Sequence, residues 1–296
     1  MNRVLSNKKA IAIFVLPAFV LFTVFVIAPI FMSFYYSLIN WTFGAKDVQF
    51  VGLKNYIDLF KNDDGQFLYA ITNSLKYTAA AVFVQLPIAF LLAAVLATGI
   101  KGEGFFRTAY FIPVVVSGVV IGQLWLKIYN YDYGMLNTFL KAVGLSANIK
   151  DWLGDASTAT NAIIVTSTWQ YIPYHMLLLY AGIKSVPKEV LESAKIDGAS
   201  FFKTLTHIII PMMMPMIEMC VTFSVIGSLK IFDMVYAMTP NGGPLHSTDV
   251  PSTMLIQSIF TQYQYSYGSA MACFIVIECL VLTIFIQRIF RKNYES

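Results

Sequence analysis

Six long apolar stretches, separated by shorter polar segments, constrain this chain more than any other feature of its sequence. Each reaches the length of about 20 residues that a helix needs to cross the hydrocarbon core of a bilayer. They cover residues 11–38, 72–99, 107–129, 160–183, 211–238 and 267–290. Hydrophobic residues make up 57% of the 296 positions and charged residues 12%, which is too apolar for one soluble core to absorb. The sequence therefore predicts an all-α integral membrane protein with six transmembrane helices.

The first apolar stretch follows a basic N-terminus, as the core of a signal peptide does. Residues 11–38 are longer than a signal core and contain no convincing small-residue cleavage site, so we expect a retained first span. The expected organisation is a cytoplasmic N-terminal segment (1–10), a six-helix transmembrane domain (11–290) and a cytoplasmic tail (291–296).

The distribution of basic residues predicts the orientation in the membrane. Of the 20 lysines and arginines, twelve fall in inner segments and five in outer loops if the N-terminus is cytoplasmic. Cytoplasmic loops carry the excess of positive charge, so we expect both termini and the loop 184–210 to be cytoplasmic.

Motifs for nucleotide, metal or nucleophilic chemistry are missing from the sequence. It has no Walker A loop, no Gly-rich dinucleotide turn, no zinc spacing and no G-x-S-x-G elbow. No basic patch with interleaved aromatic residues suggests a nucleic-acid partner. We therefore expect no catalytic residue, no metal site and no cofactor bound by this chain.

The loop 184–210 contains the densest polar helix predicted in the chain. Pro187 suits the first position of a helix over residues 188–197. Asp197-Gly198 ends that helix, because glycine tolerates the left-handed backbone of a helix end. Ser200 can then cap a second short helix. The expected product is a short helix joined by a tight corner to the next element.

The spacing in this loop resembles the EAA loop of importer permeases in the ATP-binding-cassette (ABC) superfamily. Their pattern is E-A-A-x-x-x-G, nine residues, then I-x-L-P; here Glu192-Ser193-Ala194 and Gly198 precede Ile208-Ile209-Ile210-Pro211. Ser193 replaces an alanine of that pattern and Ile210 a leucine. The segments 196–199, 230–233 and 239–244 further resemble carbohydrate permeases of the maltose-transporter type, so the resemblance covers nearly the whole chain.

The resemblance implies that the loop between spans 4 and 5 is a coupling helix that docks into a separate cytoplasmic ATPase. The implied coupling residues are Glu192, Ser193, Ala194, Asp197, Gly198 and Ala199. ATP and Mg would be bound by that ATPase and not by this chain. The resemblance also implies a second homologous permease subunit, two ATP-binding-cassette subunits and an extracellular solute-binding protein, assembled in the bacterial cytoplasmic membrane.

Aromatic and polar side chains gather in the third, fourth and fifth spans, as a sugar path would require. The residues expected to line that path are Gln123, Trp169, Gln170, Tyr174, Ser228, Lys230, Phe232 and Asp233. A phosphorylated solute would favour arginine, yet none lies between Arg107 and Arg288. We therefore predict a neutral or weakly acidic saccharide, with an oligosaccharide favoured.

Two alternatives stay open at the level of the sequence. Glu218 and Glu278 fall inside spans, where ionisable residues are functional candidates, so an ion-coupled secondary transporter is one. The absence of a detectable internal repeat counts against it. The other is an ABC permease for solutes of the glycerol-phosphate type.

Overall fold

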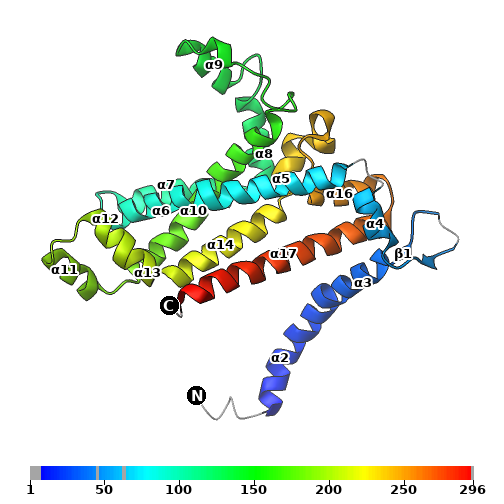
Figure 1. Cartoon of the computed structure of the whole chain (residues 1–296), viewed down its shortest axis with the longest axis horizontal. Coiled ribbons are helices and arrows are strands. Elements are labelled where there is room, and N and C mark those ends of the chain that lie inside the picture. The colour runs from blue at the N-terminus through cyan, green and yellow to red at the C-terminus, as the bar shows by residue number, and fades with distance from the viewer. Residues whose placement is uncertain (1–7, 45–46, 62–64, 295–296) are drawn as a thin grey trace. The chain divides into compact units, whose positions relative to one another are not determined.

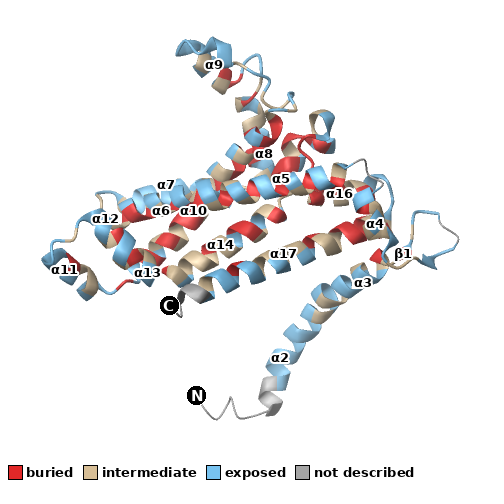
Figure 2. Cartoon of the chain, viewed as in Figure 1, coloured by how far each residue is buried: buried red, intermediate tan, exposed pale blue. Residues whose placement is uncertain are grey.

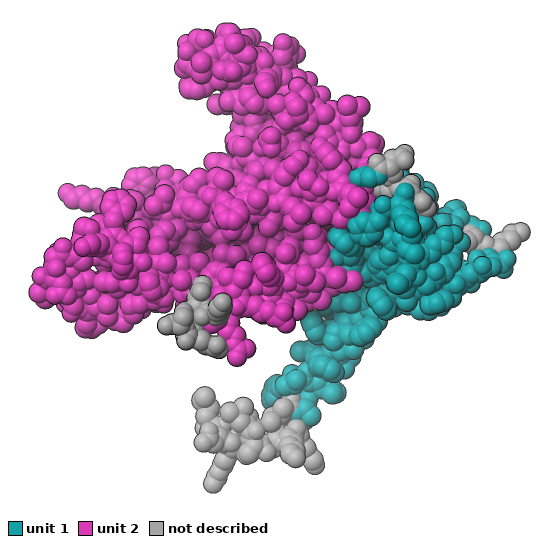
Figure 3. All heavy atoms as spheres, viewed as in Figure 1, with its two compact units in different colours: residues 1–65, 255–274 teal, residues 66–254, 275–296 magenta. Residues whose placement is uncertain are grey.

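The computed structural model describes residues 8–44, 47–61 and 65–294, and most of these residues are helical. The chain forms two compact units, residues 1–65 with 255–274, and residues 66–254 with 275–296 (Figure 3). The predicted terminal segments lie partly outside the described residues, at 1–7 and 295–296.

The first unit contains the first apolar helix and a small two-stranded sheet. Helix α2 (Lys8–Phe22) continues through the π-helical turn η1 (Thr23–Ile27) into α3 (Ala28–Ser37). Strands β1 (Ile39–Asn40) and β2 (Gln49–Phe50) are antiparallel, with Ile39 opposite Phe50, and α4 (Lys54–Lys61) follows. The π-helical turn η7 (Gln257–Thr261) also belongs to this unit. Most side chains of α2 and α3 that the structure describes are exposed, as expected of a lipid-facing span (Figure 2).

The second unit holds most of the remaining helices. In chain order they are α5 (Gln66–Ala80), η2 (Ala81–Gln85), α6 (Leu86–Ala97), α7 (Glu103–Val115), α8 (Gly118–Ile128), α9 (Met135–Ala142), η3 (Ser146–Asn148), α10 (Ala159–Lys184), α11 (Lys188–Ile196), α12 (Phe201–Thr204), η4 (Leu205–Ile209), α13 (Ile210–Met212), α14 (Met214–Leu229), α15 (Asp233–Met238), η5 (Pro240–Gly242) and η6 (Pro244–His246). Helices α16 (Pro251–Ile256) and α17 (Tyr265–Tyr294) each contain a boundary between the units.

The predicted count of six spans is not confirmed. Among the described residues, three helices (12–37, 66–97 and 265–291) are long and apolar enough to cross a membrane. Two sharply bent helix pairs raise the number to five if each pair is one span. Helix α10 covers the predicted fourth span over 26 residues, but its many polar side chains keep it out of this count.

The third and fifth predicted spans are broken, which corrects the expectation of continuous helices there. Helices α7 and α8 meet at 95°, and the segment 201–212 meets α14 at 76°. At the first break Pro113 lies inside the last turn of α7 and Val116 has an extended backbone. Ser117 is also extended and caps α8 by accepting from the Val120 N–H, so α8 starts in a new direction and leaves α7 almost at a right angle (Figure 1).

The core of the second unit lies between α6 and α10. Buried alanines of α6, Ala89 and Ala93 among them, pack with Met176 and Leu179 of α10. Small residues let two helices approach closely, which is how helices associate in lipid without a hydrophobic driving force. This contact fixes α10 as the central helix against which the other elements of the unit are placed.

Candidate functional site

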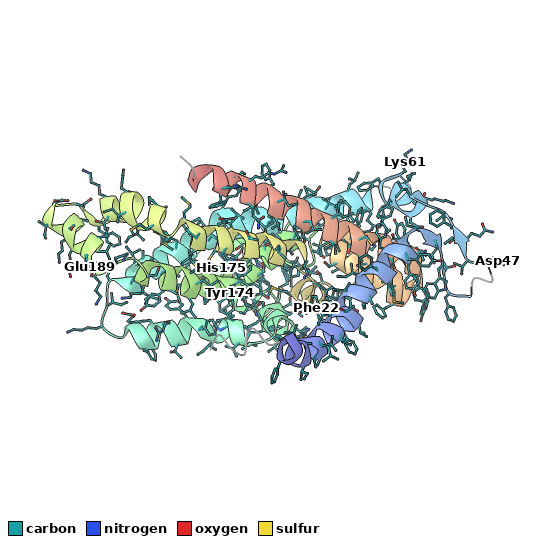
Figure 4. All side chains as sticks on the ribbon, turned by 90° about the horizontal axis from the view of Figure 1, so that it is seen from below. Phe22, Asp47, Lys61, Tyr174, His175 and Glu189 are labelled. Atoms are coloured by element: carbon teal, nitrogen blue, oxygen red, sulfur yellow. The ribbon has the colours of Figure 1, made fainter. Side chains whose placement is uncertain are left out.

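A cavity of about 470 Å³ lies inside the second unit, next to the middle of α10. Its walls come from α5 and η2, from α10, from α14 with the connection to α15, and from Gly118 at the start of α8. Its volume falls within the range of small-molecule sites in proteins, about 300–1,000 Å³. Figure 4 shows the labelled Tyr174 and His175, two of its lining residues, in the middle of the unit.

One wall is a single face of the second apolar helix. Tyr77, Ala81 and Gln85 recur every four residues and all line the cavity. The turn that ends at Gln85 is π-helical, and Pro87 is the second residue of α6, which follows. Because Pro87 has no N–H for the carbonyl four residues earlier, the ladder loosens at this turn, and such π-helical turns are frequent at functional sites.

The wall that Gly118 contributes, at the start of α8, depends on the break between α7 and α8. Gln170 of α10 is 1% exposed, and its Nε2 donates to the carbonyls of Pro113 (3.3 Å) and Val116 (3.0 Å). Carbonyls at a helix end have no helical N–H partner, and here the buried amide of Gln170 supplies one. A Cβ on Gly118, just after the break, would lie 3.5 Å from the Asp233 Cβ, which brings α8 against the start of α15.

Aromatic rings and one pair of opposite charges make up much of the remaining lining. Tyr171, Tyr174, Phe223 and Phe232 supply ring surface. Lys230 and Asp233 are the lysine and the carboxylate of the lining, and their formal charges cancel. An apolar pocket with a few convergent polar groups is the usual form of a site for a small organic molecule.

The structure brings together five of the eight residues predicted for the solute path. Tyr174, Ser228, Lys230, Phe232 and Asp233 line the cavity. The other three predicted residues do not line it.

Each of those three has a different environment. Gln170 holds the helix break, as described above. Trp169 is 41% exposed and packs edge-on against Trp125, with ring centroids 5.5 Å apart. Gln123 is exposed on α8 and donates to the Ala237 carbonyl at 3.4 Å.

Several lining residues were not among the predicted path residues. Gln85 Nε2 lies 2.9 Å from His175 Nδ1, and His175 Nε2 lies 3.0 Å from Ser224 Oγ. Tyr77 lines the cavity beside them, and its hydroxyl has no hydrogen-bond partner among the described residues. The available sequence signal was the eight-residue spacing of Tyr77 and Gln85, which places both polar side chains on the same side of a helix.

The loop that follows α15 is held rigidly by buried polar contacts. Asn73 Nδ2 donates to the carbonyls of Ser247 (2.8 Å) and Asp249 (3.0 Å), and Thr160 Oγ1 also donates to Ser247 O (2.7 Å). A Cβ on Gly242 would lie 2.6 Å from both Asp249 carboxylate oxygens, and its φ of +84° also requires glycine. Burial raises the pKa of the Asp249 carboxyl above its ordinary value, and the hydrogen bond with His246 (2.9 Å) opposes that rise.

The short helix and the tight corner predicted over residues 188–200 are present. Helix α11 ends at Ile196, Gly198 has a φ of +70°, and the N–H groups of Gly198 and Ala199 donate to the carbonyls of Lys195 (3.2 Å) and Ala194 (2.9 Å). This pair of bonds is the Schellman motif that ends many helices at a glycine. Ser200 caps α12 as predicted, with its Oγ accepting from the Lys203 N–H.

The remaining predicted coupling residues divide by exposure. Ala194 is buried, Ala199 is partly buried, and Glu192, Ser193 and Asp197 are exposed. Ile196 is 85% exposed, so α11 presents an apolar side chain beside its charged ones. Glu189 of α11 lies at one end of the unit, away from Tyr174 and His175 (Figure 4). Among the described residues, no group of three or more His, Cys, Asp or Glu side chains could hold a metal ion.

Comparisons with known proteins agree on one family. Residues 85–295 match the family described as the binding-protein-dependent transport system inner membrane component. The chain is 37% identical over 293 residues to the probable ABC transporter permease protein YurN of Bacillus subtilis, covering 98% of this chain and 99% of that protein. It is 31% identical to the diacetylchitobiose uptake system permease protein NgcF of Streptomyces coelicolor, covering 92% and 79%.

A solved structure has the same fold. It is a chain of a bacterial alginate ABC transporter in complex with an alginate pentasaccharide-bound periplasmic protein. The two chains superpose with a TM-score of 0.83 at 20% sequence identity, over 98% of this chain and 96% of that one.

Proposed function

The chain belongs to the family of binding-protein-dependent transport system inner membrane components, and we propose that it forms half of the pore of an ATP-driven saccharide importer. This family is one of transport permeases and not of catalytic subunits, so a separate ATPase would hydrolyse ATP with Mg. The proposed assembly adds a second homologous permease, two ATPase subunits and an extracellular binding protein. Diacetylchitobiose and alginate, the solutes named for two of the similar proteins, are both saccharides.

The observation that carries the saccharide proposal is the composition of the cavity. Tyrosine and phenylalanine rings offer flat apolar faces, and the polar groups among them can exchange hydrogen bonds with sugar hydroxyls. The cancelling charges of Lys230 and Asp233 favour a solute with no net charge. We therefore propose an uncharged saccharide, and an oligosaccharide in preference to a single sugar.

The exposed corner at 188–200 supports a mechanical role. A short helix with charged and apolar sides can be gripped by a partner, and the hydrogen-bonded end at Gly198 makes the corner rigid. A rigid corner transmits a displacement to the following helices without dissipating it. We propose that the ATPase docks at Glu192, Ser193 and the corner, and that both termini and this loop are cytoplasmic, as the basic residues indicate.

The two alternatives receive no support from the site. Family membership does not favour an ion-coupled secondary transporter, and neither Glu218 nor Glu278 lines the cavity. A permease for glycerol-phosphate-type solutes would need a cationic grip on phosphate, yet no arginine lines the cavity.

Uptake by the complete importer tests the proposal. Tyr174→Ala and Phe232→Ala each remove a ring from the cavity, and losing a desolvated stacking face costs about 1–2 kcal/mol, or roughly five- to thirtyfold. Phe83→Ala is the matched control, because Phe83 lies on η2 but is 77% exposed and outside the cavity. Normal saccharide uptake by both cavity variants, in liposomes supplied with loaded binding protein, would remove the cavity from the solute path.

A further inference from the structure

We propose that Tyr77, Gln85, His175 and Ser224 form a subsite, on one wall of the cavity, that reads the hydroxyl groups of an uncharged saccharide. The inference rests on the proposed function and assigns a role to residues outside the predicted path. All four side chains line the cavity and are at most 5% exposed. They come from α5, η2, α10 and α14, so three separate stretches of the chain meet at this wall.

The hydroxyl of Tyr77 is the first reason for the assignment. Tyr77 is 2% exposed, and its Oη has no hydrogen-bond partner among the residues that the structure describes. Leaving a buried polar group unpaired costs about 1–3 kcal/mol, so such groups are rare in folded proteins. A phenylalanine would fill the same space without that cost. A tyrosine here is explained if a solute hydroxyl reaches Oη when the cavity is occupied.

The second reason is a chain of polar contacts through His175. Gln85 Nε2 lies 2.9 Å from His175 Nδ1, which is also 3.2 Å from the Tyr171 carbonyl, and His175 Nε2 lies 3.0 Å from Ser224 Oγ. These contacts orient Gln85, His175 and Ser224 relative to one another. A hydroxyl has one donor and two acceptor positions, so Ser224 Oγ keeps hydrogen-bonding capacity at the cavity wall beyond its single contact with His175.

The remaining hydrogen-bonding capacity indicates the class of ligand. Tyr77 Oη can donate and accept, and Ser224 Oγ keeps at least one free acceptor position. A sugar hydroxyl also donates and accepts, so neighbouring hydroxyls can bond both residues. A carboxylate or phosphate only accepts and requires positive charge or several donors, which this wall does not supply. The wall therefore fits uncharged, hydroxyl-rich ligands and disfavours anions.

Tyr77→Phe tests the subsite with little risk to the fold. The variant removes only an oxygen that has no partner in the protein, so its thermal stability should equal or exceed that of the wild type. Binding is measured on the complete membrane complex without the binding protein, by a proximity assay with tritiated saccharides. The panel contains maltose, trehalose, cellobiose, diacetylchitobiose and an alginate trisaccharide. We expect Tyr77→Phe to raise the Kd of the tightest uncharged member roughly three- to tenfold.

Tyr129→Phe is the matched control. Tyr129 is also buried, but it lies outside the cavity lining and its hydroxyl donates to the Ala162 carbonyl at 3.0 Å. This variant should lower the melting temperature and leave the Kd unchanged, which is the reverse of the expectation for Tyr77→Phe. Singly deoxygenated analogues of the tightest saccharide add a sharper readout. One analogue, lacking the hydroxyl that Tyr77 reads, should bind wild type and Tyr77→Phe equally.

Four outcomes overturn the inference, and the last two show whether the proposed function survives it. An unchanged Kd in Tyr77→Phe, with every deoxygenated analogue affected alike, would exclude Oη from the subsite. Tighter binding of the alginate trisaccharide than of every uncharged member would refute the ligand class. If Tyr174→Ala weakens binding while Tyr77→Phe does not, the cavity remains the solute path and only this subsite is refuted. If the wild type binds no panel member, the proposed function and the inference fail together.

Discussion

The break between α7 and α8 can be tested by replacing the amide that holds it. Gln170→Met keeps an unbranched side chain of similar length and removes both polar atoms. In the wild type, Gln170 Nε2 donates to Pro113 O at 3.3 Å and to Val116 O at 3.0 Å, and the residue is 1% exposed. The substitution therefore leaves two carbonyls of a broken helix without their partner at a buried side-chain position.

The expected loss of stability follows from counting unpaired groups. Each buried carbonyl left without a donor costs about 1–3 kcal/mol. The substitution also removes Gln170 Oε1, which already lacks a partner among the described residues, and this offsets about one such cost. The net destabilisation is about 1–3 kcal/mol. At roughly 2–4 °C per kcal/mol for a chain of this size, the melting temperature should fall by about 2–12 °C.

Intrinsic tryptophan fluorescence during thermal unfolding of the purified protein in detergent measures this shift. Trp125 on α8 and Trp169 beside Gln170 both report on the region of the break. Gln287→Met is the matched control, because Gln287 is exposed on α17 and the same chemical change should leave stability unaffected. Equal melting temperatures for Gln170→Met, Gln287→Met and the wild type would refute the claim that this amide stabilises the break.

Three further predictions concern the corner, the topology and the loop after α15. Gly198→Ala places a methyl group in open space at a φ of +70°, so only backbone strain of about 1–2 kcal/mol opposes this variant. Gly198→Pro also removes the N–H that donates to the Lys195 carbonyl. Solute-stimulated ATPase activity of the complete importer should fall more in Gly198→Pro, and normal coupling in both variants would make the corner a simple connector. The topology is tested in a background without Cys220, Cys273 and Cys279. A membrane-impermeant thiol reagent added outside should label the variant Leu245→Cys, at a position that is 91% exposed, and should not label Ser200→Cys. The opposite pattern would invert the topology. Burial raises the pKa of Asp249, so at a pH above 3.8 the folded state still binds a proton that the unfolded chain has lost. Stability should therefore fall as the pH rises from 3.8 through the raised pKa. Asp249→Asn should flatten the dependence of melting temperature on pH above 3.8, and an unchanged slope would contradict this cause.

The local features of the coupling corner could be predicted because they depend on neighbouring residues. A helix end at a glycine and a serine cap are decided by backbone conformation within a few positions. The structure accordingly has the left-handed Gly198 and the capping Ser200. The predicted first helical residue was Pro187, which instead precedes the helix by one position. Such differences at helix ends are small compared with the breaks in the spans.

The breaks could not be predicted because proline in a membrane helix has more than one outcome. Pro173 lies inside the continuous helix α10, whereas Pro113 is followed by a turn of 95°. The difference lies in what surrounds each proline. At Pro113 a distant amide, Gln170, satisfies the carbonyls that the turn exposes. Tolerance of a break therefore depends on a residue that is 57 positions away in the chain.

Some residues predicted for the solute path do not line the cavity, because they were chosen by closeness in sequence and not by position around a helix. Ser167, Tyr171 and Tyr174 line the cavity and are spaced by four and three residues, so they share one face of α10. Trp169 is two residues from Tyr171, about 200° around the helix, and faces Trp125 instead. Assigning faces to α10 from the sequence would have required knowing which side packs on α6.

Amides within apolar spans show why residue type alone does not identify a solute site. Gln170 and Asn73 each place one buried amide nitrogen on two backbone carbonyls, the first at the α7–α8 break and the second at the loop after α15. Gln85 instead bonds another cavity side chain, His175, and lies in the cavity wall. An amide that bonds two carbonyls of irregular backbone has no free donor for a solute, so its effect on transport must be indirect. An amide that bonds a cavity side chain can orient that side chain toward a solute, which is why we propose the polar wall at Gln85 as a part of this cavity that distinguishes one saccharide from another.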